Sequence, residues 1–584
     1  MKDFLKQVLA VIVGTMVVSV FSTVMMVMMM VSMMMVTGQS TPVMDGSVLH
    51  LKLSGIISER VQTDELSQLT GMVSIEEQGL DDILTAIRVA KSDERVEGIY
   101  IEGGALEANP ASLKEIRDAL LDFKTSKKFL IAYGDNYSQG AYYVASVADK
   151  VYINPSGMID WHGMSSQPIF FKELLEKVGV KMQVFRVGTY KSAVEPFTAT
   201  EMSDANRDQV NAYISDIWSE ISTAVSKSRG ISLDTLNAYA NTYVSLWDNS
   251  QYMKKHLADS AFYMDQVRKE LKKLTGRDNM FLVSPAVLAA NEEVFTANDE
   301  VAVYYAYGDI VDVSSDFVGQ TEIVGNQVVY DLDQLASDEN VKAVVIRINS
   351  GGGSAYASEQ MWRAIEELKK KKTVVVSMGD MAASGGYYMA CGADRIFAQP
   401  TTLTGSIGIF GLVPDASGLL TDKLGLRFDV VKTNDAADFG AMNRPFNVAE
   451  SAAMQQYVER GYALFLKRVA EGRKMKVEQV DSIAQGRVWT GNQALKIGLV
   501  DELGSLQDAI AYAAKKANLV DYQVGCYPLP LEWWESVSTS FQKDYLEGRV
   551  HSALGDYYHP LRFVSTIGEQ PSLQARIPYM PNLK

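Results

Sequence analysis

Cysteine and histidine are scarce in this chain of 584 residues, which disfavours several kinds of site. The two cysteines, Cys391 and Cys526, are far apart and form no CxxC pair, so we expect neither a disulfide framework nor a structural zinc site. The five histidines are scattered without HxH or HxxxH spacing. Metal catalysis and a serine–histidine–aspartate triad are therefore disfavoured, and we expect no metal and no cofactor.

Clusters of basic residues are also lacking. Asp and Glu outnumber Lys and Arg by 71 to 55, which gives a formal net charge of −16, and no long basic block occurs. Because phosphate binding requires clustered Lys and Arg, we expect no nucleic-acid partner. With 47% hydrophobic residues, the chain is long and apolar enough for two or more domains with cores.

One long stretch has no charge at all. An apolar and small-residue run extends from Val8 to Val36, and Lys2 and Lys6 precede it. It exceeds the roughly 20 residues that cross a bilayer as a helix and is too long for the core of a signal peptide. Residues 1–40 are therefore predicted to form a cytoplasmic stub and one transmembrane helix, with the rest of the chain outside the cytoplasm.

The sequence contains an internal repeat. "YGDNYSQGAYYVASVADKVYINP" (133–155) aligns without a gap to "MGDMAASGGYYMACGADRIFAQP" (378–400), and shorter matches flank it on both sides. A repeat of this kind predicts two copies of one fold. We expect homologous domains at 45–290 and 300–525, followed by a carboxyl-terminal extension, 526–584, that matches neither.

Each repeat alternates short Val/Ile/Tyr-rich runs with stretches of helical periodicity, such as 358–372. This alternation predicts an α/β fold with helices packed on largely parallel strands. Glycine-rich turns follow the strands expected at 344–348 and 373–377. Because sites in such folds lie at the carboxyl ends of strands, these turns are where a site is expected.

Ser384 lies in the second of these turns, within "MAASGGYY". It is either a nucleophile or a small residue that fits a tight backbone. Its counterpart in the first repeat is Gln139, a larger side chain in a matched environment. The mismatch favours a chemical role for Ser384.

The opposite asymmetry occurs at Lys191 in "VGTYKSAVEP", whose counterpart is Ala437. A single loop lysine is usually solvated. Here, however, one repeat has the serine without the lysine, and the other has the lysine without the serine. The two residues are therefore predicted to form one Ser/Lys pair across the domain interface, in which the lysine serves as the base that a serine nucleophile needs.

Several motifs in order closely resemble the signal peptide peptidase A (protease IV) family of Clp/crotonase-like serine peptidases. The motifs are "NSGGGS", "MAASGGYY", "TGSIGIFG", "GTYKSAVEPF" and "GRVWTG…GLVDELG". The resemblance covers residues 45 to 520. It implies two tandem homologous Clp/crotonase-like domains behind one transmembrane helix.

The resemblance also implies roles for individual residues. Ser384 matches the family nucleophile and Lys191 the general base. Ser406, which alone reads as an ordinary turn serine, matches a serine that hydrogen-bonds the lysine. Gly353 and Gly385 match the backbone donors of the oxyanion hole. The chain departs from the family at Gly351, where a proline is frequent.

The expected function is a membrane-anchored serine endopeptidase that degrades remnant signal peptides and other extended apolar peptides. The resemblance further implies a homotetramer on the inner membrane, with its catalytic domains on the periplasmic side. Two alternatives stay open at this point: a crotonase-fold acyl-CoA enzyme, and a catalytically inactive membrane scaffold.

Overall fold

The computed structural model describes residues 14–16, 18–22, 24–25, 43–61, 77–292, 296–314, 322–529 and 573–576. The predicted membrane anchor lies largely outside these ranges. Within them, no helix combines the length and the apolar character needed to cross a bilayer.

The first repeat forms a parallel sheet with the strand order β2-β1-β3-β4-β5-β7, and β8 pairs with β1. Its strands are β1 (Ser47–Ser58), β2 (Glu77–Gly79), β3 (Val96–Glu107), β4 (Phe129–Tyr137), β5 (Lys150–Ile159), β7 (Ser260–Ala261) and β8 (Phe281–Val283). The helices of this half are α3 (Leu80–Ser92), α4 (Pro110–Phe123), α5 (Gln139–Ala145), α8 (Asp204–Arg229), α9 (Leu233–Ala240), α10 (Asn249–Lys254), α11 (Met264–Thr275) and α12 (Pro285–Ala289). Apolar residues at helical spacing, such as Ile83 and Ile87 of α3, are buried in its core.

The second repeat forms a sheet with the order β18-β16-β14-β12-β9-β20, in which β15 pairs with β14 and β19. Its strands are β9 (Glu300–Tyr307), β12 (Val341–Ser350), β14 (Thr373–Ala383), β15 (Arg395–Ala398), β16 (Leu403–Gly405), β18 (Val488–Thr490), β19 (Glu502–Leu503) and β20 (Gln523–Tyr527). The central strands β12 and β14 are almost wholly buried, as expected for a sheet covered on both faces. The order β1-β3-β4 of the first sheet recurs here as β9-β12-β14, so the two halves are tandem copies of one α/β fold.

The helices of the second half are α13 (Gly325–Ser337), α14 (Ala355–Lys369), α15 (Gly385–Ala390), α16 (Val448–Arg473), α17 (Val477–Ile483), α18 (Gly491–Lys496) and α19 (Leu506–Lys516). Helix α14 begins and ends earlier than the predicted range 358–372. The earlier start is explained by an N-terminal cap: Ser354 Oγ accepts a hydrogen bond from the Ala357 N–H at 3.1 Å.

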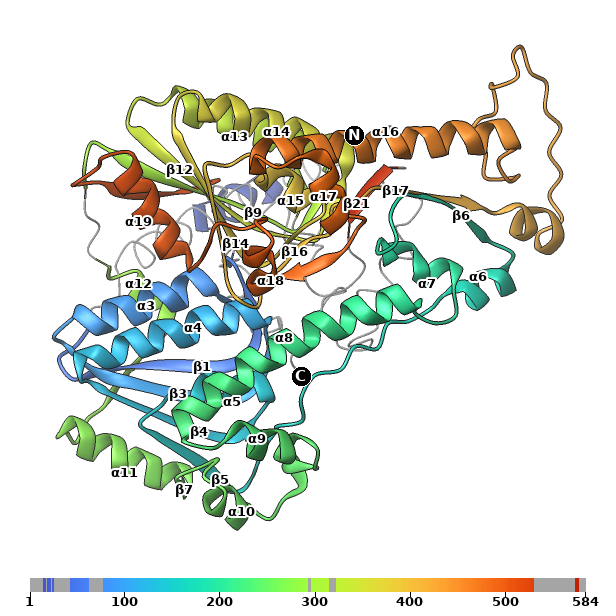
Figure 1. Ribbon diagram of the computed structural model, residues 1–584. Coiled ribbons are helices and arrows are strands. Elements are labelled where there is room, and N and C mark those ends of the chain that lie inside the picture. The colour runs from blue at the N-terminus through green and yellow to red at the C-terminus, as the bar shows by residue number, and fades with distance from the viewer. Residues whose placement is uncertain are drawn as a thin grey trace, which may run out of the picture.

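A third sheet joins the halves, with the order β11-β10-β13-β21-β17-β6. Its strands are β6 (Lys181–Arg186), β10 (Asp309–Val311), β11 (Glu322–Val324), β13 (Gly352–Ser354), β17 (Phe410–Asp415) and β21 (Leu573–Arg576). Strand β6 comes from the first repeat, where it is flanked by α6 (Lys172–Val178) and α7 (Glu195–Thr198), and it pairs antiparallel with β17 of the second repeat. Figure 1 shows this connection to one side of the two main sheets, with α8 extending toward it.

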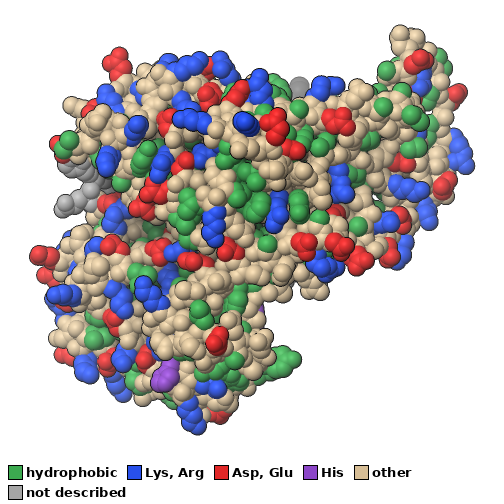
Figure 2. Space-filling view, in the orientation of Figure 1, with side chains coloured by type: hydrophobic (Ala, Val, Ile, Leu, Met, Phe, Trp, Pro, Cys, Tyr) green, Lys and Arg blue, Asp and Glu red, His purple; other side chains and the backbone are tan. Residues whose placement is uncertain are grey.

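The counterpart of β6 in the second repeat has no such partner. Residues 424–434 match 178–188 in sequence, yet they form no strand and are exposed. We call residues 416–446 the arm; it contains exposed apolar side chains, of which Val431 is 98% exposed. Figure 2 shows the acidic and basic side chains interspersed over the visible face.

A buried ionic network also holds the halves together. Arg347 of β12 is 2.8 Å from a Glu115 carboxylate oxygen and donates to Glu59 at 3.0 Å. Asp380 of β14 accepts hydrogen bonds from the backbone and side chain of Ser112, at 2.8 and 2.5 Å. The two strands that lead into the predicted oxyanion turn and the predicted nucleophile are thus tied to α4 of the first repeat.

Candidate active site

Ser384 lies between the end of β14 and the start of α15, in an unusual backbone conformation. Its φ of 55° and ψ of −112° fall outside the regions that residues with a side chain usually adopt. Two contacts hold this turn: the Ser384 N–H donates to the Gly405 carbonyl oxygen, and the Tyr388 N–H donates to the Ser384 carbonyl oxygen, each at 2.8 Å. Strain of about 1–3 kcal/mol persists only where the surroundings impose it, and it is concentrated at functional sites.

Lys191 reaches this serine from the other repeat. It follows β6, whose pairing with β17 carries the chain across to the second half. The Lys191 Nζ lies 2.6 Å from Ser384 Oγ, and both residues are buried, at 1% and 0% exposure. Two residues that are 193 positions apart in the chain are thereby brought into direct contact.

Ser406 lies at the same point, because β16 runs parallel to β14 and ends beside it. The Lys191 Nζ is 3.1 Å from both the Ser406 Oγ and the Ser406 carbonyl oxygen. A neutral amine has two N–H donors and one lone pair. The two Ser406 oxygens match the donors, which leaves the lone pair for the Ser384 hydroxyl.

Burial lowers the pKa of the Lys191 ammonium well below its usual range, because a charge is poorly solvated there. Among the described residues, no neighbouring charge contributes to this shift. A lysine with a carboxylate partner would remain protonated instead. This environment therefore favours the neutral amine, the form that can accept a proton.

Two glycines leave room for the lysine side chain. A Cβ on Gly408 would stand 3.2 Å from Lys191 Cδ, and one on Gly486 would stand 2.6 Å from Lys191 Cα. Gly486 also has a φ of +82°, which favours glycine. The shape of this pocket is therefore set by the second repeat, while its occupant comes from the first.

Residues that the sequence did not single out hold the Lys191 loop in place. Gln209 of α8 donates to the Tyr190 carbonyl oxygen at 3.1 Å and to Ser192 Oγ at 3.0 Å, and it accepts from the Val488 N–H at 3.1 Å. The Arg487 guanidinium lies 5.0 Å from the centre of the Tyr190 ring. Arg487 belongs to the motif "GRVWTG", which was the only signal in the sequence; Gln209 had none.

The two predicted oxyanion donors, Gly353 of β13 and Gly385 at the start of α15, lie beside one short strand, β21. Gly353 of β13 is paired with Ala575 of β21. A Cβ added to Gly385 would stand 3.2 Å from the Ala575 carbonyl oxygen. A Cβ added to the neighbouring Gly352 would collide with the same oxygen and stand 2.7 Å from the Gly385 nitrogen. The turns that carry both donors thus converge on one carbonyl group.

The equivalent position in the first repeat is closed. The Gln139 side chain is buried, accepts from the His162 and Gly163 N–H groups at 2.9 Å, and donates to the Gly163 carbonyl oxygen at 2.8 Å. The counterpart of Ser406 is Trp161, a fully buried ring whose Nε1 donates to the Leu236 carbonyl oxygen at 3.0 Å. Both side chains fill space that the second repeat keeps for its serines and lysine.

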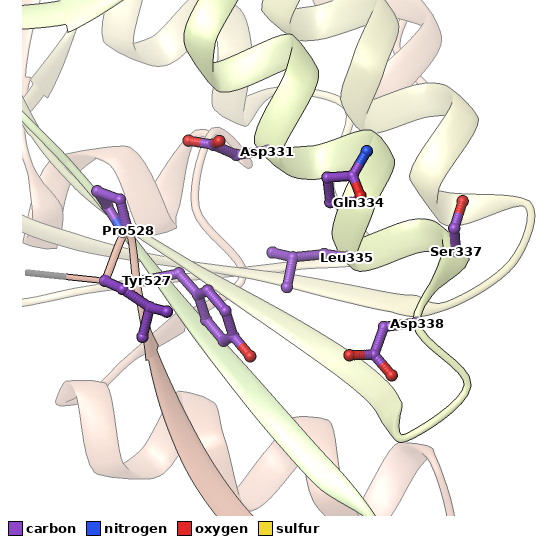
Figure 3. A pocket seen from close by; sticks show the side chains of 8 residues that line it. Asp331, Gln334, Leu335, Ser337, Asp338, Tyr527 and Pro528 are labelled. Atoms are coloured by element: carbon purple, nitrogen blue, oxygen red, sulfur yellow. The ribbon is translucent and has the colours of Figure 1, made fainter.

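A separate hollow of about 510 Å³ lies between α13 and the end of β20, away from this pair (Figure 3). Its lining comprises Asp331, Gln334, Leu335, Ser337, Asp338, Tyr527, Pro528 and Leu529. Among the described residues, this lining includes two carboxylates and no basic side chain, which disfavours a phosphate-bearing ligand.

The doubled α/β fold with a strained serine in its second copy defines a class, the Clp-like serine peptidases. The chain belongs to peptidase family S49, which matches residues 122–278 and 366–520, and the Clp protease family matches residues 307–403. It is a serine-type endopeptidase of the protease IV, or signal peptide peptidase A, type.

Three relatives illustrate this membership. Protease 4 of Salmonella typhi is 38% identical over 82% of this chain and 80% of its own length. Protease 4 of Haemophilus influenzae is 36% identical over the same shares. The chloroplastic serine protease SPPA of Arabidopsis thaliana is 31% identical over 82% of this chain and 70% of its own.

Proposed function

We propose that this chain is a membrane-anchored endopeptidase in which Ser384 and Lys191 form the catalytic dyad. Its proposed substrates are remnant signal peptides and other extended apolar peptides. The observation that carries the proposal is the 2.6 Å approach of Lys191 Nζ to Ser384 Oγ in a buried site. Family membership alone does not assign these two residues; their contact supports the assignment.

In the proposed reaction, neutral Lys191 takes the Ser384 hydroxyl proton as the oxygen attacks the peptide carbonyl carbon. The N–H groups of Gly353 and Gly385 stabilise the negative oxygen that develops. When the peptide C–N bond breaks, Lys191 gives its proton to the leaving amine. Water then hydrolyses the acyl-enzyme by the same route, and Ser406 keeps the flexible lysine side chain aimed throughout.

The proposed preference for extended peptides rests on the strands beside the dyad. A peptide in β conformation gains main-chain hydrogen bonds from a neighbouring strand, and near the site β13 and β17 already bond in this way to an extended segment, β21. Signal peptides released from a membrane are apolar and unfolded, so they meet this requirement.

The membrane anchor and its orientation are proposed from the uncharged run at 8–36 and the two lysines before it. This topology puts the catalytic domains on the periplasmic side of the inner membrane. Protease protection in inverted and right-side-out vesicles tests it: the domains should be digested only when the periplasmic side is accessible.

The proposed homotetramer is supported by the unequal arms of the two repeats. The segment containing β6 pairs with β17 of the second repeat. The matching arm, 416–446, has no comparable strand partner among the described residues. A second copy of the chain would supply this missing partner by pairing a strand with the arm, as β17 pairs with β6. In sedimentation velocity, Val431→Asp should shift tetramers toward smaller species, while Lys423→Asp on the same arm should not.

Neither alternative function is favoured by the site. An acyl-CoA enzyme needs a basic patch for phosphates, whereas the charged side chains that the described residues contribute to the hollow beside α13 are two carboxylates. An inactive scaffold has no need to keep a buried lysine against a strained serine.

A fluorophosphonate probe tests the dyad. The solubilised full-length protein should be labelled at Ser384, Ser384→Ala should lose the label, and Lys191→Ala should lose most of it. The matched control is Lys181→Ala, an exposed lysine on β6, which should label normally. Undiminished labelling of Lys191→Ala would refute the dyad.

A further inference from the structure

The segment 485–488, which leads into β18, lies between the Lys191 loop and the Ser406 turn. It contains the start of the motif "GRVWTG", to which the proposed reaction assigns no role. On one side of the segment, the Gln485 carbonyl oxygen accepts a hydrogen bond from the Tyr190 N–H at 2.9 Å. This bond fixes the residue directly before the proposed base.

On its other side, the same segment bonds to the turn that carries Ser406. The Gly486 N–H donates to the Ile407 carbonyl oxygen at 2.8 Å, and the Ser406 N–H donates to the Arg487 carbonyl oxygen at 2.7 Å. Gly486 also packs on the base, since a Cβ there would stand 2.6 Å from Lys191 Cα. The segment therefore contacts the base, the residue before the base, and the serine that the base touches.

The backbone of this segment has an uncommon conformation. Gln485 has a φ of +53° and Gly486 a φ of +82°, so two consecutive residues lie in the left-handed region. A residue with a side chain keeps such a conformation only where its surroundings impose it, and such positions are concentrated at functional sites. The hydrogen bonds to the lysine loop and to the Ser406 turn supply that constraint.

Gln209 of α8 completes the connection from the first repeat. Its amide nitrogen lies 3.1 Å from the Tyr190 carbonyl oxygen and 3.0 Å from Ser192 Oγ, and these two residues flank the lysine. Its amide oxygen accepts from the Val488 N–H at 3.1 Å. Because the nitrogen and oxygen of one amide are a fixed distance apart, this buried side chain sets the separation between the lysine loop and the segment 485–488.

The glutamine is present in only one of the two repeats. Helices α8 and α16 are matching helices of 26 residues, and their N-caps are Ser203 and Asn447. Counted from these caps, Gln209 matches Ala453, which is exposed. The repeat that supplies Lys191 therefore also supplies the amide, and the other repeat has alanine at both positions.

We propose that Gln209 is a positioning residue and that residues 485–488 form a clamp, through which Lys191 is held at bonding distance from Ser384 and Ser406. The clamp fixes the backbone on both sides of the lysine, which is needed because a lysine side chain is a flexible four-carbon stem. Neither the clamp nor Gln209 exchanges a proton in the reaction. This inference rests on the proposed dyad and adds the contacts that keep its geometry.

Steady-state kinetics across pH on the solubilised full-length protein are the first test. Gln209→Met keeps an unbranched side chain of similar length but has no amide, so kcat for a Leu/Ala-rich fluorogenic peptide should fall about tenfold at pH 7. KM should stay unchanged, because the hydrogen bonds of Gln209 go to the lysine loop, to β18 and to α8 itself. A loosened lysine is better hydrated, so its lowered pKa should rise toward 10.5 and move the pH midpoint of kcat upward.

Ile221→Val on the same helix is the matched control. Ile221 is buried in the core of the first repeat, so the loss of a methyl group should lower the melting temperature. This control should leave kcat and its pH midpoint unchanged. If Gln209→Met keeps the wild-type kcat and midpoint, or if Ile221→Val moves the midpoint as far, the positioning role is wrong.

Ser192→Ala keeps the proposal testable if Gln209→Met fails to fold. This milder change removes one of the oxygens that face the Gln209 amide nitrogen and leaves the others. It should lower kcat about twofold to threefold and move the pH midpoint upward. An unchanged midpoint would contradict the clamp.

The two proposals fail in different ways. If Lys191→Ala retains full fluorophosphonate labelling, the dyad itself is wrong. If that label is lost while Gln209→Met keeps wild-type kinetics, the dyad stands and only the positioning role is wrong.

Discussion

The turns at Ser384 and at Gln139 have matched sequences and different structures. Gln139 is the first residue of α5, with an ordinary cap from Ser138, whereas Ser384 stands before α15 with a positive φ. At this turn, the backbone is strained only in the repeat that has the serine. Two copies of one fold thus differ at the position where one is proposed to do chemistry.

The side chains that fill the space beside each turn also differ between the two repeats. In the second repeat it contains Ser406 and the incoming Lys191. In the first repeat Trp161 fills it, with its ring centre 4.8 Å from that of Trp218 and the two rings tilted by 47°. The first repeat thus uses for core packing the space that the second repeat fills with Ser406 and Lys191, two polar side chains.

The largest expected effect comes from removing the base. Lys191→Met keeps the bulk of the side chain but has no proton acceptor, so kcat/KM for a peptide substrate should fall about 10²–10⁴-fold. The matched change in the first repeat, Gln139→Ser, should create no second site, because Trp161 fills the space that corresponds to the position of Ser406. Activity from a Ser384→Ala/Gln139→Ser double variant would break the comparison.

Although Lys191→Met should lower activity, it should raise the free energy of unfolding by an amount that depends on pH. The pKa of Lys191 is lowered by burial in the folded state. Between that value and the ordinary lysine value of 10.5, the unfolded chain binds more protons, so wild-type stability rises with pH. The variant should therefore be the more stable protein at pH 7, with a difference that shrinks toward pH 10.5 in denaturant titrations.

Wild-type kcat should rise with pH through the same lowered pKa, since only the neutral amine accepts a proton. A flat profile from pH 6 to 10 would contradict Lys191 as base.

Ser406 and Trp161 should give opposite results when each is replaced by alanine. Ser406→Ala removes one hydrogen bond to the lysine but leaves the carbonyl contact, so kcat should fall about tenfold with little change in melting temperature. Trp161→Ala empties a buried site and should cost about 3–5 kcal/mol of stability while kcat stays unchanged. Equal effects on kcat would show that the two halves are coupled at these positions.

The smallest effect is expected at a matched pair of glycines. Gly408→Ala puts a methyl group 3.2 Å from Lys191 Cδ, so the lysine must shift and kcat should fall about threefold to tenfold. Gly163→Ala meets no neighbour but has a φ of +87°, so it should lower stability by about 1 kcal/mol without changing kcat. Steady-state kinetics and thermal melts on both variants check this.

The repeat made the contact between Ser384 and Lys191 predictable. Ser384 and Lys191 differ from their counterparts Gln139 and Ala437, and this reciprocal difference is visible without any structure. The α/β class also followed from the alternation of strands and helices. The domain boundaries at 45–290 and 300–525 stay a prediction, since β6 and β21 both pair outside their own segments.

Contacts between distant segments were not predictable in this way. Gln209 and the Arg347 network have no local pattern, because their partners lie in the other half of the chain. The 424–434 segment matches β6 in sequence yet is not a strand, since a strand requires a neighbour. For the extension, 526–584, the sequence indicated only that it matches neither repeat; residues 526–527 and 573–576 pair with strands of the same chain.

The crossing of β6 has a consequence for synthesis of the enzyme. The lysine emerges from the ribosome 193 residues before the serine, and neither half contains both. Since domains fold as units beginning at the amino terminus, a nascent or truncated chain has no complete site. With the proposed dyad, the peptidase therefore gains its complete site only after both halves of the chain have folded.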